Sequence, residues 1–183
     1  NIAEKSIDEI LTDHAYCEQK AASTCISLII QFPDRTDLVD ELTPIVAEEW
    51  GHFRKVIKEL KTRGYSFGKK RIDDYVVELM KFQRKGGKEI DRLMDKLLIS
   101  AMIEARSCER FRLLSLHISD EKIKKFYHKR LIFCSLLHPS DLLPYLQLKT
   151  VVLQEPLLWL FAHQSFFAEF RLSFLFRLFL VQF

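Results

Sequence analysis

The sequence predicts an all-α fold built from long helices. Its 183 residues include only five glycines and five prolines, so few positions interrupt a helix. Apolar side chains recur at three- and four-residue spacing over four long stretches, the pattern of helices that each bury one face. A chain of this length buries roughly two-thirds of the surface that it exposes when unfolded, so we expect these helices to share a core.

The first two long helices are expected at residues 4–32 and at about 37–63. A proline follows Phe32, and proline disfavours helix in the residue before it, so the first helix should end there. Gly64 is expected to end the second helix, because glycine adopts the left-handed conformation that often follows a helix. Pro44 lies early in the second span and predicts irregular or kinked first turns.

Three further helices follow in the sequence. A short one is expected at about 74–84, a long one at about 88–116, and the fourth long helix at about 120–137. Ser119 and Asp120 precede the last of these and supply the side chains of a helix N-cap. A His-Pro pair at 138–139 then ends the helix.

The C-terminal part of the sequence has a different composition. Eight of the fifteen phenylalanines fall after residue 150, and no glycine occurs beyond Gly87. We therefore predict a helical bundle at 1–150 and an atypical Phe/Leu-rich tail at 151–183. A shifted reading frame in the coding sequence would produce such a change of composition, and a tail that docks only loosely on the bundle is the alternative. Its longest uncharged run is too short to cross a bilayer, so no stable membrane span is expected.

Charge and cysteine content leave several partners open. The net charge of +3 permits a nucleic-acid partner without requiring one. The four cysteines show no C-x-x-C spacing, which favours reduced thiols in a cytoplasmic protein. Cations are densest between residues 69 and 88, where either a solvated surface or a phosphate-binding surface fits. The candidate substrate-binding residues are Lys69, Lys70, Arg71, Arg84 and Lys85.

Four residues form a pattern typical of a metal centre. Glu49 and His52 lie three residues apart, so a helix projects them from one face. Glu18 falls inside the apolar stripe of the first helix, and Glu104 falls inside that of the third long helix. A buried carboxylate is costly unless it is paired, protonated or bound to metal, and a salt bridge at the edge of the stripe is the alternative for Glu18.

This pattern matches the ferritin-like arrangement, in which four helices surround two metal ions. Two of its helices each supply one glutamate, and the other two each supply a Glu-x-x-His motif. Oxygen and nitrogen ligands without thiolate favour iron or manganese over zinc. The predicted fold class is therefore an all-α ferritin-like four-helix bundle with additional short helices and the Phe/Leu-rich tail.

Three segments also resemble a known family. They are similar to segments of the bacterial tRNA isopentenyladenosine hydroxylases. The three segments are DHAYCEQKAAS at 13–23, EEWGHF at 48–53 and IEARSCERF at 103–111. These enzymes are ferritin-like di-iron monooxygenases that act on 2-methylthio-isopentenyladenosine, and the resemblance covers roughly residues 4–128. It implies that Glu18, Glu49, His52 and Glu104 are iron ligands and that Glu109 is a less favoured choice.

The resemblance also implies an activity. It is the oxygen-dependent hydroxylation of the isopentenyl group of a hypermodified adenosine next to the anticodon of tRNA. The implied cofactors are two iron ions, with dioxygen as co-substrate and an electron donor that the sequence does not identify. Apolar residues that include Cys17, Trp50 and Ile103 are then expected to exclude water from the metal centre.

The sequence departs from the family pattern on the fourth helix. The family has a Glu-Ala-Arg-His run there, and the nearest match in this sequence is Ser135-Leu136-Leu137-His138. His138 is thus the last expected ligand, whereas Ser135 replaces a bridging glutamate, so we expect the second iron to bind weakly. An inactive or merely iron-binding bundle that has lost this carboxylate is the alternative. A plain helical module, whose Glu and His residues satisfy one another, is a third hypothesis.

Overall fold

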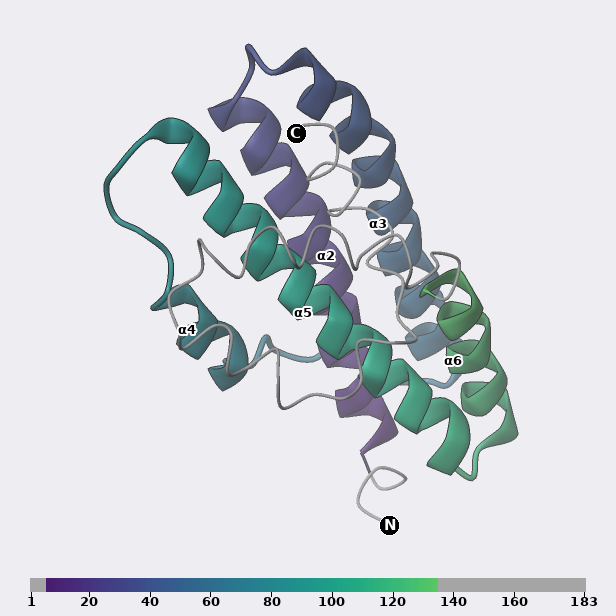
Figure 1. Cartoon of the computed structure of the whole chain (residues 1–183). Helices are drawn as coiled ribbons and strands as arrows, with labels where there is room; N and C mark the ends of the chain where they lie inside the picture. The colour runs from purple at the N-terminus through teal and green to yellow at the C-terminus, as the bar shows by residue number, and fades with distance from the viewer. Residues whose placement is uncertain (1–5, 135–183) are drawn as a thin grey trace. The chain divides into compact units, whose positions relative to one another are not determined.

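The computed structural model describes residues 6–134, with only the backbone described at 131–134. All regular elements among these residues are helices, which confirms the predicted all-α class (Figure 1). They are α2 (Ile7–Gln31), α3 (Thr36–Thr62), α4 (Asp74–Met80), α5 (Glu89–His117) and α6 (Glu121–Cys134). The predicted tail, the predicted boundary near residue 150, Ser135 and His138 lie outside the described residues.

The expected helix ends are largely confirmed. Gly64 has a φ of +74°, and the amides of Gly64 and Tyr65 donate to the carbonyls of Lys61 (3.0 Å) and Leu60 (2.9 Å). This is the Schellman motif that glycine favours. Asp120 caps α6, because its Oδ1 accepts hydrogen bonds from the amides two and three residues later, both at 3.0 Å.

Two helices differ from expectation. α3 continues through Pro44 without a break, so its first turns are regular helix; Leu42, two residues before the proline, and Ile45, directly after it, are 0% and 8% exposed and hold this part of α3 in the core. α4 ends at Met80 and not near residue 84. The amides of Lys81 and Phe82 bond three residues back, at 3.1 Å each, and such tightened turns are common where a helix ends.

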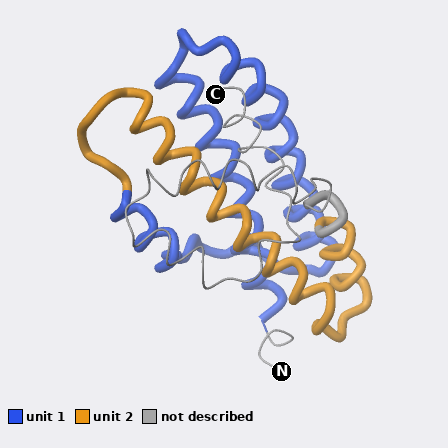
Figure 2. The backbone as a smooth tube through the Cα atoms, in the orientation of Figure 1, with its two compact units in different colours: residues 1–82, 180–183 blue, residues 83–179 orange. Residues whose placement is uncertain are grey.

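The described residues divide into two compact units, one that ends at residue 82 and one that begins at residue 83 (Figure 2). In the first unit, α2 and α3 pack side by side and antiparallel, as their four-residue connection requires (Figure 1). Their shared core consists of fully or almost fully buried aliphatic side chains: Leu11, Ala15, Leu28, Leu38, Leu42, Val56 and Leu60. The buried stripes predicted for these two helices are therefore confirmed in their aliphatic part, whereas Trp50 of α3 is 46% exposed.

In the second unit, α5 packs against α6. Tyr127 is fully buried, and its ring lies 5.4 Å from that of Phe111 and 5.3 Å from that of Phe126. None of the helices in the described part of the protein is both long enough and apolar enough to cross a membrane.

Replacing Tyr127 with alanine should lower the free energy of unfolding by about 3–5 kcal/mol, since it leaves a cavity the size of an aromatic ring between α5 and α6. Denaturant unfolding followed by circular dichroism measures the loss. His128→Ala, at the exposed neighbouring position, is the control and should change stability by less than about 0.5 kcal/mol. Equal losses in the two variants would contradict the packing described here.

Candidate metal centre

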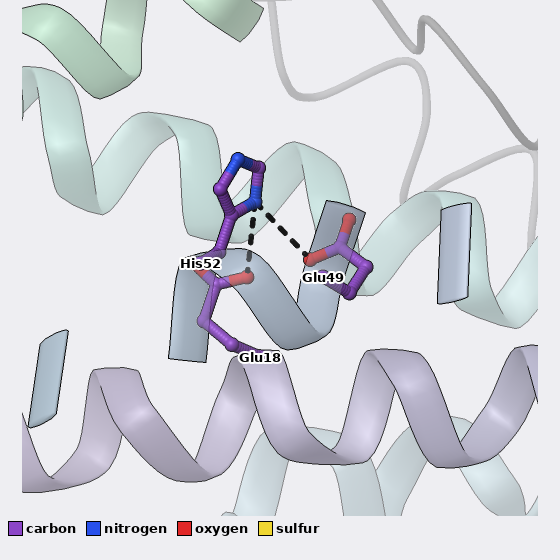
Figure 3. Close-up of side chains that lie close together, drawn as sticks. All are labelled: Glu18, Glu49 and His52. Carbon is purple, nitrogen blue, oxygen red and sulfur yellow. Dashed lines mark ion pairs between the residues drawn. The ribbon is translucent and has the colours of Figure 1, made fainter. Parts of the chain in front are cut away.

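The antiparallel pairing of α2 and α3 brings three of the predicted ligands together. Glu18 lies on the buried face of α2, and Glu49 and His52 lie one turn apart on α3 (Figure 3). Their side chains point toward one another, and Glu18 and His52 are 7% and 9% exposed. The first helix and the Glu-x-x-His motif of the second therefore meet as the sequence predicts.

The spacing of these three side chains suits a metal ion. His52 Nδ1 lies 3.7 Å from Glu18 Oε2 and 3.5 Å from Glu49 Oε2. One ligand atom from each residue lies within 4.8 Å of the others. The two imidazole–carboxylate distances exceed the roughly 2.7–3.2 Å of ordinary hydrogen bonds, and they leave room for an ion between the three groups. Two carboxylates and one imidazole form a donor set that fits iron.

His14 belongs to the same cluster, although sequence reasoning assigned it no role. Its Nε2 lies 2.6 Å from Glu18 Oε1, and the side chain is almost completely buried. His14 precedes Glu18 by four residues, so one helical turn sets the contact. A histidine four residues before a buried glutamate was the signal available in the sequence. His14 holds one carboxylate oxygen and leaves the other directed at His52.

The surroundings of Glu18 keep it ionised. Burial raises the pKa of its carboxyl group, but polar contacts with His14, His52 and Glu49, together with the charge of His14, outweigh burial. The pKa of Glu18 is therefore held well below its usual range. A carboxylate that is ionised in the folded protein is ready to bind a cation.

Changing His14 should weaken metal binding without removing a ligand. We expect His14→Leu to lower iron affinity by about 10–100-fold, the usual effect of losing a group that orients a ligand. His14→Gln should recover part of the affinity, because its amide can donate to Glu18. Anaerobic competition against a coloured chelator measures both affinities. If both variants bind iron as the unaltered protein does, His14 does not position Glu18.

Glu104 and His138 are the other two predicted ligands, and His138 lies outside the described residues. Glu104 lies on α5 in the second unit, is half-buried, and accepts a 3.9 Å hydrogen bond from Cys108 Sγ. Glu109, the less favoured choice, forms two hydrogen bonds with Arg112 at 2.8 and 3.0 Å. This pairing agrees with a structural role for Glu109. Whether Glu104 and His138 complete the centre stays a prediction.

The candidate substrate-binding cations differ in their surroundings. Lys69, Lys70 and Lys85 are exposed. Arg71 pairs with Asp13 at 2.7 Å and with Glu9 at 3.1 Å. Arg84 pairs with Asp95 at 2.9 Å. Both arginines thus bind carboxylates of the protein itself, whereas no ion pair involves Lys69 or Lys70 within the described residues.

A comparison with protein families identifies the family to which this sequence is similar. Residues 1–154 match the model of a family described as tRNA-(MS[2]IO[6]A)-hydroxylase (MiaE). The chain belongs to this family. The match extends past residue 128, where the resemblance seen in the sequence ended, and it includes Ser135 and His138 of the predicted fourth helix.

Two curated MiaE relatives carry the same name, tRNA 2-(methylsulfanyl)-N(6)-isopentenyladenosine(37) hydroxylase. The protein from Pseudomonas putida is 38% identical over 66% of this chain and 58% of its own length. The protein from Salmonella typhimurium is 28% identical over 64% of this chain and 60% of its own length. The chain thus spans about three-fifths of the curated relatives that it matches.

A solved structure supports the fold. A Synechococcus protein described as having aldehyde deformylating oxygenase activity matches with a TM-score of 0.67 and 30% identity. The match covers 85% of this chain and 74% of that protein. That protein is ferritin-like, so the predicted ferritin-like fold of this MiaE protein is confirmed.

Proposed function

We propose that this protein hydroxylates the isopentenyl group of a modified adenosine in tRNA, using iron and dioxygen. The observation that carries the proposal is the cluster of Glu18, Glu49 and His52, in a member of the MiaE family. The names of the curated relatives supply the substrate class and the reaction. The fold shared with an oxygenase gives independent support.

Residues of the first unit could bind iron in an environment that contains little water. Glu18, Glu49 and His52 would be ligands, and His14 would fix the orientation of Glu18. The neighbours one turn away on the same faces, such as Ala15, Ala22 and Val56, are all buried and apolar. They lower the local dielectric and keep solvent from the carboxylates, which strengthens their hold on a cation.

We further propose that Glu104 and His138 complete a site for two iron ions, of which the second is bound weakly because Ser135 replaces the expected glutamate. Bound iron would supply the oxygen chemistry: one atom of dioxygen is inserted into a C–H bond of the isopentenyl group, and the other leaves as water after taking up two protons and two electrons, the electrons coming from a donor. The protein's own residues bind the iron, keep Glu18 ionised and exclude bulk water. The tRNA substrate implies a cytoplasmic location, and the electron donor is a separate partner.

Labelled dioxygen tests the activity. The iron-loaded protein would be incubated with a chemical reductant, ¹⁸O₂ and tRNA that carries the isopentenylated adenosine. The expected product is that nucleoside with one labelled oxygen atom, detected by mass spectrometry after digestion of the tRNA. Glu49→Ala should give none. Absence of labelled product from the unaltered, iron-loaded protein would overturn the proposed function.

A further inference from the structure

Four aromatic rings form a continuous strip in the first unit. Trp50 stacks on Phe53 at a centroid distance of 4.8 Å, and Phe53 meets the edge of Phe67 at 6.0 Å. Phe67 in turn stacks on Tyr16 at 4.6 Å. We call these residues the aromatic strip. Trp50 and Phe67 remain 46% and 42% exposed, so the strip offers ring surface to a partner.

The strip borders the candidate metal ligands in the sequence. Trp50 follows Glu49, Phe53 follows His52, and Tyr16 precedes Glu18 by two residues. Each ligand of the cluster therefore has a strip residue within two positions on its own helix. A ligand held on the strip would be placed beside the metal centre.

The loop between α3 and α4 is fixed against α2, which positions Phe67. The Tyr16 hydroxyl donates to the Gly68 carbonyl at 3.1 Å. Gly68 approaches Thr12 so closely that an added Cβ would lie 3.3 Å from the threonine methyl group. Arg71 then binds Asp13 through two nitrogens, at 3.2 and 2.7 Å. These contacts hold the loop in one conformation and reduce the ordering cost of binding.

Exposed cations follow two residues of the aromatic strip closely in the sequence. Arg54 follows Phe53 on α3, and Lys69 and Lys70 follow Phe67 in the loop; all three are exposed. Within the described residues no ion pair neutralises them, whereas the nearby carboxylate of Asp13 is neutralised by Arg71. Exposed rings flanked by unneutralised cations are the pattern of surfaces that bind single-stranded nucleic acid.

We propose that the aromatic strip, with Arg54, Lys69 and Lys70, binds the unpaired anticodon loop of the tRNA substrate. Trp50 would stack on an unpaired base next to the modified adenosine, and the three cations would contact phosphates. The inference rests on the proposed function and adds to it the surface that recognises the substrate. The charge of these cations favours RNA over an apolar protein segment as the occupant.

Fluorescence anisotropy with an anticodon stem–loop RNA tests the cations. Two charge-matched variants of the iron-free protein are compared. They are Arg54/Lys69/Lys70→Ala and Lys122/Lys125/Lys129→Ala, the latter at exposed positions of α6. The first should reduce the slope of log affinity against log salt by about 2, since three phosphate contacts are lost. The α6 variant should keep the original slope. Equal changes in both variants would overturn the proposal.

Trp50 has its own test. Trp50→Ala should weaken binding of the stem–loop by about tenfold, and Trp50→Phe should recover much of the loss. Neither should change binding of a blunt-ended, two-stranded RNA duplex of equal charge, which offers no unpaired base. Ile30→Ala, at a 71% exposed apolar position of α2, is the control. Unchanged binding in Trp50→Ala would overturn the assigned role.

Intrinsic fluorescence gives a direct readout of the stacking. The protein has two tryptophans, so Trp159→Phe leaves Trp50 as the single reporter. Quenching of its emission by the stem–loop supports stacking, and unchanged emission at saturation contradicts it. If the unaltered protein yields labelled product and binds RNA elsewhere, only this inference fails. If it neither binds RNA nor yields product, the proposed function fails with it.

Discussion

Replacing Glu18 with glutamine should abolish tight iron binding. Glutamine keeps the size of the side chain but removes the negative charge that His14 orients toward His52. The affinity should fall by more than the roughly 10–100-fold expected for a group that only orients a ligand. Thermal unfolding with and without ferrous iron, under anaerobic conditions, measures the effect. Iron at about 100 times its Kd should stabilise the unaltered protein by about 2.7 kcal/mol and leave the variant unchanged.

The same experiment separates a metal centre from a purely structural network. If Glu18 only satisfies buried histidines, iron stabilises neither protein, and the substitution merely destabilises the fold. Glu109→Gln is the matched control, because Glu109 pairs with Arg112 outside the cluster and should respond to iron as the unaltered protein does.

Acidification adds a check in the absence of iron. The folded pKa of Glu18 is lowered, so its stabilising effect is present above the unfolded pKa and is lost as the pH falls through the folded value. Glu18→Gln should remove this part of the pH dependence. A variant that loses stability on acidification as steeply as the unaltered protein would contradict the ionised state of Glu18.

Replacing Ser135 with glutamate should raise the iron content from one to two ions per protein molecule. The serine hydroxyl cannot bridge two metal ions as a carboxylate can, so the unaltered protein should hold the second iron weakly. Anaerobic reconstitution, removal of loosely bound metal and iron analysis measure the stoichiometry. Ser135→Gln is the matched control, since it adds the length of glutamate without the charge, and it should stay at one.

Two irons in the unaltered protein would contradict this prediction, because other ligands would then complete the site despite Ser135. The hydroxylase function would still stand in that case. One iron that rises to two only in the glutamate variant would indicate an inherited site weakened at its fourth helix.

The helices and the core of the metal cluster could be predicted from the sequence because both follow from helical periodicity. Glu18 interrupts the apolar stripe of α2, and Glu49 and His52 lie one turn apart on α3. The three side chains therefore come together once α2 and α3 pair. The role of His14 was not predicted, because a histidine inside an apolar stripe looks like any buried residue until its contact with Glu18 is known.

Trp50 shows where periodicity fails. The sequence places it on the apolar face of its helix, yet it is 46% exposed, so this placement is wrong. Its expected role in excluding water from the metal centre stays a prediction. One residue turns a helix by about 100°, so the neighbour of an inward Glu49 lies at the margin of the buried face. Stacking on Phe53, and not burial, accommodates the indole.

Iron anomalous diffraction from crystals of the anaerobically reconstituted protein tests the central claim most directly. We expect an iron peak within bonding distance of carboxylate oxygens of Glu18 and Glu49 and of a ring nitrogen of His52. A peak at another place, or no peak at this cluster in an iron-loaded crystal, would contradict the assignment of these three residues as the metal centre.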